Sequence, residues 1–338
     1  MGVRTIHILG AGPAGAAAAI AARSEGCPVT LFEKSRLPRH KVCGEFLSPG
    51  VCRLLEQLGL WEEFLRAGPA PIHRLALHFG TRAKQYKLPG CAYGLSRYRF
   101  DRLLVEQAVA LKAVLKTGGA PEAAAAPDGA AEPPAATVLA TGRYAIAPPG
   151  DRLFGFKAHF RGPVQDAVEL FFFSGSYVGV SPIESGLTNV CGIAPEQLLR
   201  SHDFQMDALL HACAPLTERL HPLSRTMQWL TVGPLVLGGR WDLEAQEQVY
   251  PAGDALGFID PFTGSGILSA LLTGRLAGLA AAQGLSPQAH REQCRRLLAK
   301  PFRTAALIRT ALQKGWAGRL APLIPGSWLF RQTRPVVS

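Results

Sequence analysis

The sequence predicts an α/β protein in which a three-layer domain built on a parallel sheet carries an inserted antiparallel β-sheet domain. Two observations lead to this class. Residues 5–33 have the order strand, glycine-rich turn, helix and strand, with which a doubly wound parallel sheet begins. Residues 153–193 contain short β-like runs separated by turns, which is typical of an antiparallel sheet. Helical segments are expected to complete the chain after residue 266.

The elements follow in order from the spacing of apolar residues. Thr5–Leu9 and Pro28–Glu33 are expected to be buried strands, and the alanines of Ala16–Arg23 indicate a closely packed helix between them. Leucines at a helical period, or apolar residues at every second position, predict the next elements. These are a helix over 48–67, a hairpin over 74–79 and 84–88, and a helix over 100–111.

An Ala- and Pro-rich stretch over 118–136 predicts a surface connection, which a buried strand over 137–141 follows. The remaining elements come from the same patterns. They are strands over 154–160, 168–173, 177–181 and 188–193, a helix over 203–220, a strand at 249–250, a long apolar helix over 266–285, and a basic helix from 288 to about 320. The segments divide into a discontinuous three-layer domain (1–70, 93–150 and 245–290), a β-sheet domain (71–92 and 151–244) and a C-terminal helical tail (291–338).

Composition limits the classes of function. The chain has 338 residues, of which 48% are hydrophobic and 18% charged, so a large core is expected. The net charge of +11 is spread along the chain without a Lys/Arg run, which argues against a nucleic-acid partner. Seven separately placed cysteines form no C-x-x-C pair, so neither a disulfide framework nor a metal site is expected, and a reducing cytoplasm fits best.

Nothing in the sequence indicates a signal peptide, and no apolar run is taken to reach the roughly 18–20 residues of a membrane-spanning helix. We therefore expect a soluble, cytoplasmic protein. The C-terminal end, which carries Trp328 and Phe330, either caps the fold or touches lipid, so peripheral membrane contact stays open.

The first chemistry-bearing motif is Gly10-x-Gly12-x-x-Gly15. Gly10 permits a tight turn, Gly12 lets the backbone approach a pyrophosphate, and Gly15 lets the helix pack on the strand. Glu33 ends the next strand at the position expected of an acid that accepts ribose hydroxyls, which disfavours NADP. The motif in this context predicts dinucleotide binding, to which Ala14 and Lys34 are also assigned.

A second motif, Val249-Tyr-Pro-Ala-Gly253-Asp254, decides which dinucleotide is expected. It resembles the second flavin motif of FAD-dependent oxidoreductases, whose Asp holds the ribityl or pyrophosphate moiety. A glycine-rich turn then leads into the long apolar helix, and its N-terminus would stabilise negative charge on a reduced flavin ring. The residues of the turn assigned to the ring are Pro261, Gly264, Ser265, Gly266 and Ile267. We therefore predict a Rossmann-like FAD-binding three-layer domain.

Together these motifs resemble the geranylgeranyl-reductase family, within the larger group that contains p-hydroxybenzoate hydroxylase. The segment Gly253–Ile267 carries most of the resemblance. Lys41-Val-Cys43-Gly-Glu45 resembles the family segment near the flavin ring, and Arg97 is similar to an arginine that contacts FAD. Thr141 and Gly142 resemble the Ala-Thr-Gly strand end of such flavoproteins. The resemblance implies that Lys41, Cys43, Arg97, Thr141 and Gly142 bind FAD.

The sequence departs from the family at the strand expected over the substrate. The reductases have Tyr-x-Trp-x-Phe-Pro, and this chain has Tyr177-Val-Gly-Val-Ser-Pro182. Tyr177 and Pro182 are the substrate residues implied by the resemblance, although an aromatic residue in a sheet usually just packs. Ser265 stands where the family has Glu, and the Trp-x-Trp-x-Ile-Pro signature of the halogenases is absent. The identity of the substrate is left open.

We consider three functions. One is reduction of a carbon–carbon double bond in a lipophilic isoprenoid or polyketide, with Cys43 or a water on Glu45 as proton donor. The second is monooxygenation of an aromatic or polyketide substrate, and the third is a flavin-binding protein without turnover. Without a second G-x-G-x-x-G, NAD(P)H would bind only transiently as reductant. The sequence does not indicate the oligomeric state.

Overall fold

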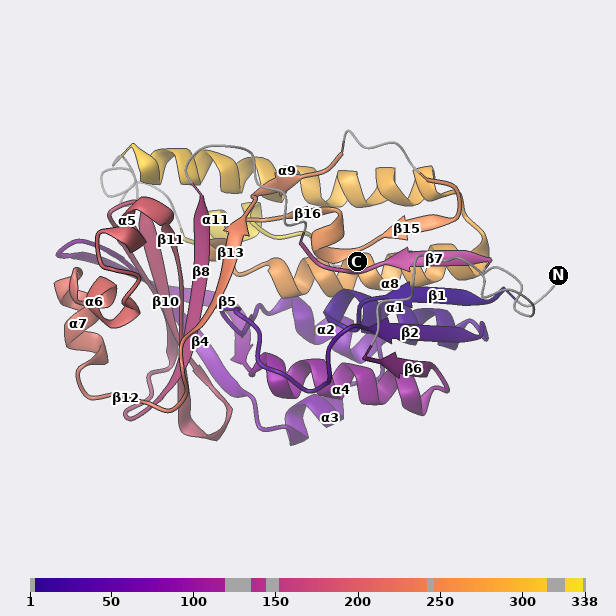
Figure 1. Cartoon of the computed structure of the whole chain (residues 1–338), viewed down its shortest axis with the longest axis horizontal. Helices are drawn as coiled ribbons and strands as arrows, with labels where there is room; N and C mark the ends of the chain where they lie inside the picture. Colours follow the sequence, from indigo (N-terminus) through magenta and orange to yellow (C-terminus); the bar gives the residue numbers. More distant parts are fainter. Residues whose placement is uncertain (1–3, 119–134, 144–151, 242–245, 315–325, 337–338) are drawn as a thin grey trace.

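The computed structural model describes residues 4–118, 135–143, 152–241, 246–314 and 326–336. A five-stranded, fully parallel sheet forms one half of the molecule (Figure 1). Its strand order is β15-β7-β1-β2-β6, with bounds Val249–Pro251, Ala136–Leu139, Ile6–Leu9, Val29–Glu33 and Val114–Thr117. The predicted first strands are confirmed, whereas β6 was not predicted because it is short and mostly exposed. Most of the Ala- and Pro-rich connection lies outside the described residues.

Helix α1 (Pro13–Ser24) follows β1 through the glycine turn and packs against α8 (Gly266–Gln283). Seven of the twelve residues of α1 are alanine, and ten of the twelve are buried. A Cβ on Gly274 of α8 would lie 2.1 Å from the backbone oxygen of Ala14, and one on Gly278 would lie 2.3 Å from that of Ala18. The small residues therefore let the two helix backbones touch, which fixes α8 behind the glycine turn.

Helix α8 is long and apolar enough to cross a membrane by length and composition, so the expectation that no run reaches this length was wrong. The apolar side chains of α8 pack inside the protein. The helix lies in the core of the parallel-sheet half, and residues such as Leu268, Leu271 and Ala277 are buried against α1 and the sheet. The long apolar run is therefore explained by burial inside the protein.

A nine-stranded sheet forms the other half, in the order β12-β8-β11-β10-β9-β4-β5-β3, with β13 also paired to β8. The expectation of an antiparallel sheet was wrong at one place, because β4 and β9 run parallel. The chain passes through the other half between β5 and β8, so no hairpin fixes the direction of β9 against β4. The bounds are Ser224–Arg225 (β12), Leu153–Arg161 (β8), Leu187–Pro195 (β11), Ser176–Ile183 (β10), Ala167–Phe173 (β9), Ala70–Phe79 (β4), Arg82–Gly94 (β5), Phe46–Leu47 (β3) and Leu230–Leu235 (β13).

The two faces of this sheet differ in what covers them. The outer face buries Phe156, Val178 and Val190 against the short helices α5 (Glu196–Arg200), α6 (Met206–His211) and α7 (Ala214–Leu220). Because side chains alternate along a strand, neighbours such as Tyr177, Gly179 and Cys191 point to the inner face. That inner face looks toward the parallel sheet. The helix predicted over 203–220 is divided into α6 and α7, and Pro215 lies in the first turn of α7.

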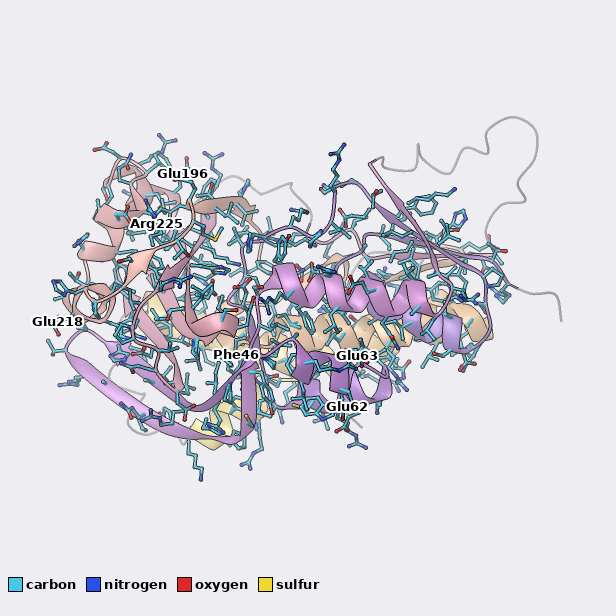
Figure 2. All side chains as sticks on the ribbon, turned by 90° about the horizontal axis from the view of Figure 1, so that it is seen from below. Phe46, Glu62, Glu63, Glu196, Glu218 and Arg225 are labelled. Atoms are coloured by element: carbon cyan, nitrogen blue, oxygen red, sulfur yellow. The ribbon has the colours of Figure 1, made fainter. Side chains whose placement is uncertain are left out.

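Five further α-helices are found in the described part of the chain. Helix α4 (Arg97–Ala110) follows β5 as predicted, and the helix predicted over 48–67 is split at Gly59 into α2 (Gly50–Gln57) and α3 (Trp61–Arg66). Phe46 of β3 lies near the middle of the molecule, where the halves meet (Figure 2). Helix α9 (Pro287–Gln313) runs along both halves, and α11 (Gly326–Gln332) lies beneath its end over the nine-stranded sheet (Figure 1).

Candidate functional site

A cavity of about 940 Å³ lies between the two halves. Its walls come from the β1–α1 turn, the loop 39–46, the inner face of the nine-stranded sheet, the segment 252–267, and the helices α9 and α11. Most of the predicted site residues meet here although they are far apart in sequence. The predicted cofactor residues that line the cavity are Gly10, Gly12, Ala14, Glu33, Lys34, Lys41, Cys43, Arg97, Thr141, Gly142, Gly253, Asp254, Pro261, Gly264, Gly266 and Ile267.

One end of the cavity is built for phosphate. Gly12 is the N-cap of α1, so the free N–H groups and the positive end of the helix dipole point into the cavity there. Lys41 Nζ and Arg97 Nη2 each lie 3.8 Å from the position that a Cβ on Gly12 would take. The two cations therefore face the space beside Gly12 that a side chain would otherwise fill. A pyrophosphate could bind in this space between the cations and the helix N-terminus.

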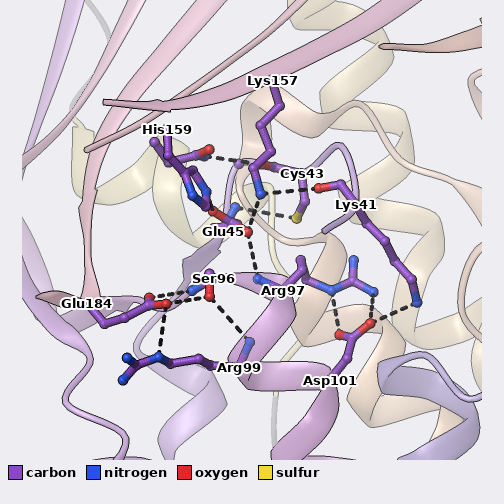
Figure 3. A network of polar contacts seen from close by, with 12 residues as sticks. Lys41, Cys43, Glu45, Ser96, Arg97, Arg99, Asp101, Lys157, His159 and Glu184 are labelled. Atoms are coloured by element: carbon purple, nitrogen blue, oxygen red, sulfur yellow. Dashed lines mark hydrogen bonds and ion pairs between the residues drawn. The ribbon is translucent and has the colours of Figure 1, made fainter. Parts of the chain in front are cut away.

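Asp101 holds these two cations in place. Its carboxylate accepts from Arg97 Nε at 2.6 Å, from Arg97 Nη2 at 2.8 Å and from Lys41 Nζ at 2.8 Å (Figure 3). Both cations lower the pKa of Asp101 despite its complete burial. One carboxylate offsets only one of the two positive charges, so a net positive charge remains for an anionic ligand.

Glu33 marks the end of the cavity next to the phosphate site. Its two carboxylate oxygens accept from the backbone N–H groups of Ala11 and Ser35, both at 3.1 Å. These bonds fix the carboxylate at the carboxyl ends of β1 and β2, and each oxygen keeps a further lone pair for a hydroxyl. The geometry fits the predicted ribose contact.

Asp254 stands on the opposite wall, in the short 3₁₀ turn Gly253–Ala255. Among the described residues no group hydrogen-bonds to its carboxylate, although it lines the cavity. Burial raises its pKa, and Arg143 and Arg97 partly oppose this effect. A half-buried carboxylate without a protein partner is free to accept hydrogen bonds, so the site fits a ligand that offers hydroxyl donors.

The turn before α8 provides an open, flat wall. Gly264 has a φ of +64°, and a Cβ on Gly266, the first residue of α8, would have no described atom within 4 Å. Asp260 fixes the turn because it accepts from the N–H of Phe262 and pairs with Arg309 of α9. Backbone that is bare of side chains at a helix N-terminus fits a flat ring that carries negative charge when reduced.

Comparison with known proteins identifies the ligand of this site. Residues 3–138, which include the glycine turn, Glu33, Lys41 and Arg97, match the FAD binding domain family. The chain is an FAD-dependent oxidoreductase. FAD is the cofactor. The geometry of the phosphate end, Glu33, Asp254 and the turn before α8 fits this molecule.

The chain is similar in sequence to a reductase and in fold to solved structures of other proteins. Digeranylgeranylglycerophospholipid reductase 2 of Methanopyrus kandleri is 27% identical over an alignment of 330 positions, which covers 83% of this chain and 77% of the relative. The flavin-dependent brominase Bmp2 has the same fold, with a TM-score of 0.76 at 18% identity, covering 98% of this chain and 93% of its own. A geranylgeranyl bacteriochlorophyll reductase-like protein from Thermoplasma acidophilum has a TM-score of 0.70 at 19% identity, covering 98% and 91%.

The loop 41–45 of the oxidoreductase is anchored by a buried ion cluster (Figure 3). Glu45 has no exposed side-chain surface and a positive φ of 53°. Its carboxylate pairs with Lys157, accepts from the N–H of Arg97 at 2.6 Å and lies 2.7 Å from Nε2 of His159. Although burial opposes ionisation, these partners lower the pKa of Glu45.

This cluster revises the role expected of Glu45. A carboxylate that stays ionised and is fully occupied by an ammonium and an imidazole is a poor proton donor. Its interactions instead hold the loop so that Cys43, whose sulfur accepts from the N–H of Glu45 at 3.4 Å, faces the cavity. Asn189 supports the same loop by donating to the carbonyl of Cys43 at 3.1 Å. Glu45 is therefore a positioning residue.

Ring nitrogens of His40 and His159 and an oxygen of Glu45 lie within 4.8 Å of one another, which is close enough for a shared metal ion. The ammonium of Lys157, however, pairs with the same carboxylate. A divalent cation here would face that positive charge at close range, so the cluster favours an ion pair over metal binding.

Three predicted residues do not reach the cavity. Gly15 and Ser265 lie behind its wall: a Cβ on Gly15 would lie 1.7 Å from the oxygen of Gly10, and Ser265 hydrogen-bonds to Thr263 at 2.8 Å. Pro182 was assigned to the substrate, but it alternates with Ser181 and points to the other face of β10. Tyr177 lines the cavity as predicted.

Several residues in or near the site were not predicted from the sequence. Arg143, which stacks over Phe258 at 4.9 Å, directly follows the Thr141-Gly142 strand end and could have been found there. Lys157 and His159 alternate in a strand that otherwise buries apolar residues, which is an unusual place for two polar groups. Arg309 and Arg334 come from the C-terminal segment, where no motif singled them out.

The free carboxylate of Asp254 leads to a prediction. The Asp254→Ala variant should bind FAD at least about tenfold more weakly, because the ribityl hydroxyls lose a charged acceptor. Equilibrium dialysis or fluorescence titration of the apoprotein with FAD measures the change. Unchanged affinity would mean that Asp254 serves only the turn, and Asp203→Ala on an exposed loop of the outer layer is the control.

Proposed function

We propose that this FAD-dependent oxidoreductase reduces a carbon–carbon double bond in a lipophilic, isoprenoid- or polyketide-like substrate. The observation that carries the proposal is the apolar floor that the nine-stranded sheet provides beyond the cofactor site. The similarity to a digeranylgeranylglycerophospholipid reductase supports it.

The floor follows from strand register. Leu77 of β4 pairs with Leu170 of β9, and Phe79 pairs with Phe172, so four apolar side chains stand side by side on the inner face. Ile308 and Leu312 of α9 and Phe330 of α11 add further apolar surface to the same cavity, and Phe330 packs with sheet residues such as Leu88. Such walls exclude water and recognise a substrate by its apolar area and shape.

Cys191 and Lys157 lie at the end of the floor near the loop 41–45. Across β10, β11 and β8, one row of paired residues runs Gly179, Cys191 and Lys157. Burial raises the pKa of the Cys191 thiol, so this group stays neutral. A lipophilic chain lying along the floor would thus bring one end to the polar, loop-facing part of the cavity.

When bound, FAD supplies the electron pair for the reduction. The chain must supply a proton, and Tyr177 and Cys43 are the groups placed to hold one. The Tyr177 hydroxyl is buried and has no hydrogen-bond partner among the described residues. Burial, together with nearby Asp260, raises its pKa well above 10, so Oη retains its proton. Cys43 presents its thiol from the loop on the same cavity.

The Tyr177→Phe variant tests the assignment to Tyr177. It should lower kcat at least about tenfold while FAD affinity stays unchanged, because phenylalanine keeps the ring packing against Phe172 and Phe262 but removes the proton. The Cys43→Ala variant is the matched comparison, and the larger loss identifies the donor. Equal activity of Tyr177→Phe and the unchanged protein would exclude Tyr177.

The reaction itself is tested by reducing the FAD-loaded protein without oxygen and then adding either a polyprenyl or polyketide substrate, or oxygen. Saturation of the substrate with reoxidation of the flavin supports the proposal. A transient C4a-adduct absorbance after oxygen, with hydroxylated product, would replace it by monooxygenation. FAD that is retained without turnover on any substrate would leave a flavin-binding protein.

Monooxygenation is the second candidate because Gly179 lines the cavity where the reductase strand has Trp, so the substrate space differs at this position. PqsL, solved with 2-aminobenzoylacetate, has a TM-score of 0.73 at 17% identity, covering 95% of this chain and all of its own, and shows that the fold accepts an aromatic ligand. For either reaction, NAD(P)H is the proposed transient reductant. A cytoplasmic location, a lipophilic small molecule as partner and peripheral membrane contact remain parts of the proposal.

A further inference from the structure

The C-terminal segment inserts an arginine into the cavity wall. Arg334, two residues after α11, lines the cavity although it lies only five residues from the C-terminus. Its guanidinium stacks on the ring of Phe330, with 3.4 Å between the guanidinium carbon and the ring centre. Nη1 donates to the carbonyl of Phe330 at 3.1 Å and to the hydroxyl of Thr333 at 3.0 Å.

The other terminal nitrogen of Arg334 reaches the turn before α8. Nη2 donates to the backbone carbonyl of Thr263 and lies 3.2 Å from the position of a Cβ on Gly264. This is the bare turn that the site geometry assigns to the flavin ring. The C-terminal segment thus places a cation beside Gly264, in the turn before α8.

The charge of Arg334 is not neutralised by the protein. No described carboxylate lies within ion-pair distance of it, whereas its counterpart Arg309 pairs with Asp260. Its Nε is buried without a hydrogen-bond partner, and burial lowers the pKa of the guanidinium to about 9. A shielded cation without a counter-ion is unfavourable by itself, so the arrangement calls for negative charge in the cavity.

We propose that Arg334 provides the positive charge that stabilises the reduced, anionic flavin ring at the turn 263–266. The inference rests on the FAD site described above but not on the identity of the substrate. Adding electrons to the ring places negative charge at N1 and the C2 oxygen, and a nearby cation favours the reduced form. The N-terminus of α8 acts in the same direction, so the helix and Arg334 would add their effects.

Charge-selective variants of the FAD-loaded protein test this proposal. Arg334→Met keeps the apolar stem that packs on Phe330 but removes the charge, and Arg334→Lys keeps the charge. Arg331→Gln, on the exposed side of α11, is the control for loss of one positive charge from the same segment. FAD affinity and thermal stability are measured for each variant first, so that a folding defect is seen directly.

The readouts need no substrate. Sulfite adds to oxidised flavin and leaves negative charge on the ring, so its affinity reports the positive charge nearby. We expect Arg334→Met to weaken sulfite binding at least tenfold and to lower the midpoint potential, measured against reference dyes. A tenfold effect on the equilibrium corresponds to about 30 mV for this two-electron couple. Arg334→Lys should stay within about threefold of the unchanged protein.

Three outcomes would overturn the proposal. If Arg334→Met keeps both the sulfite affinity and the potential, the flavin does not sense this charge. If Arg334→Met and Arg334→Lys both lose FAD, Arg334 is structural. If only the KM for a carboxylate- or phosphate-bearing substrate rises, the cation binds substrate and not the reduced ring.

Discussion

The Gly12→Val variant is expected to fold and to be purified without its yellow cofactor. A single Cβ at Gly12 would make ordinary contacts, because the nearest atoms, Lys41 Nζ and Arg97 Nη2, lie 3.8 Å away. The two γ-carbons of valine would extend from there into the space that the cations enclose. FAD affinity should fall at least about a hundredfold, or roughly 3 kcal/mol, because the pyrophosphate loses both space and close N–H contacts.

Titration of the apoprotein with FAD gives the affinity, and the thermal midpoint of the apoprotein shows whether the fold is kept. Gly12→Ala is the graded comparison and should lose much less, since its Cβ fits. Ala306→Val, on the exposed face of α9, controls for enlargement of a side chain away from the site. A Gly12→Val protein that binds FAD normally would disprove the assignment of the phosphate site.

Removal of Lys157 is expected to have the largest effect on stability. The Lys157→Met variant leaves the carboxylate of Glu45 buried with only His159 and one backbone N–H. Breaking a completely buried pair in this way should cost about 3–5 kcal/mol of unfolding free energy. Denaturant unfolding at neutral pH measures the loss. The double variant with Glu45→Gln should recover part of it, because no uncompensated charge then remains.

The same pair predicts how stability depends on pH. The pKa of Glu45 in the folded protein lies below its ordinary value near 4.5. Its stabilisation is therefore fully present above that value and is lost as the pH falls through the folded pKa. The difference in unfolding free energy between the unchanged protein and Lys157→Met should shrink below about pH 4.5. A difference that stays constant down to pH 3 would show that charge is not its cause.

Local patterns in the sequence were sufficient for the cofactor end of the site. The glycine turn, Glu33 and Asp254 each belong to one strand end, and in a parallel sheet the carboxyl ends of the strands meet at one edge. Their convergence therefore follows from strand direction alone. The expected strands over 154–193 also occur, because short runs rich in apolar and β-branched residues, separated by turns, are a local property of the sequence.

Features that depend on contacts between distant segments were not predictable in this way. The parallel pairing of β4 with β9 joins strands from two separate segments, and no spacing within either strand encodes it. A water on Glu45 was expected as a proton donor, because nothing in the sequence around Glu45 indicates its ion-pair partners. Those partners, Lys157 and His159, follow more than a hundred residues later. Arg334 was missed for the same reason, since its partners Thr263 and Gly264 are remote.

The order in which the chain builds the parallel sheet has a consequence for its synthesis on the ribosome. Strands β1, β2, β6 and β7 are complete by residue 139. The edge strand β15 ends only at residue 251, and helix α8, which packs against α1, ends only at residue 283. Helix α1 and the first four strands of the parallel sheet therefore leave the ribosome before α8 can pack against α1. More than a hundred further residues are translated in the meantime. During that interval this part of the chain is exposed to aggregation, and a chaperone would be most useful before α8 appears.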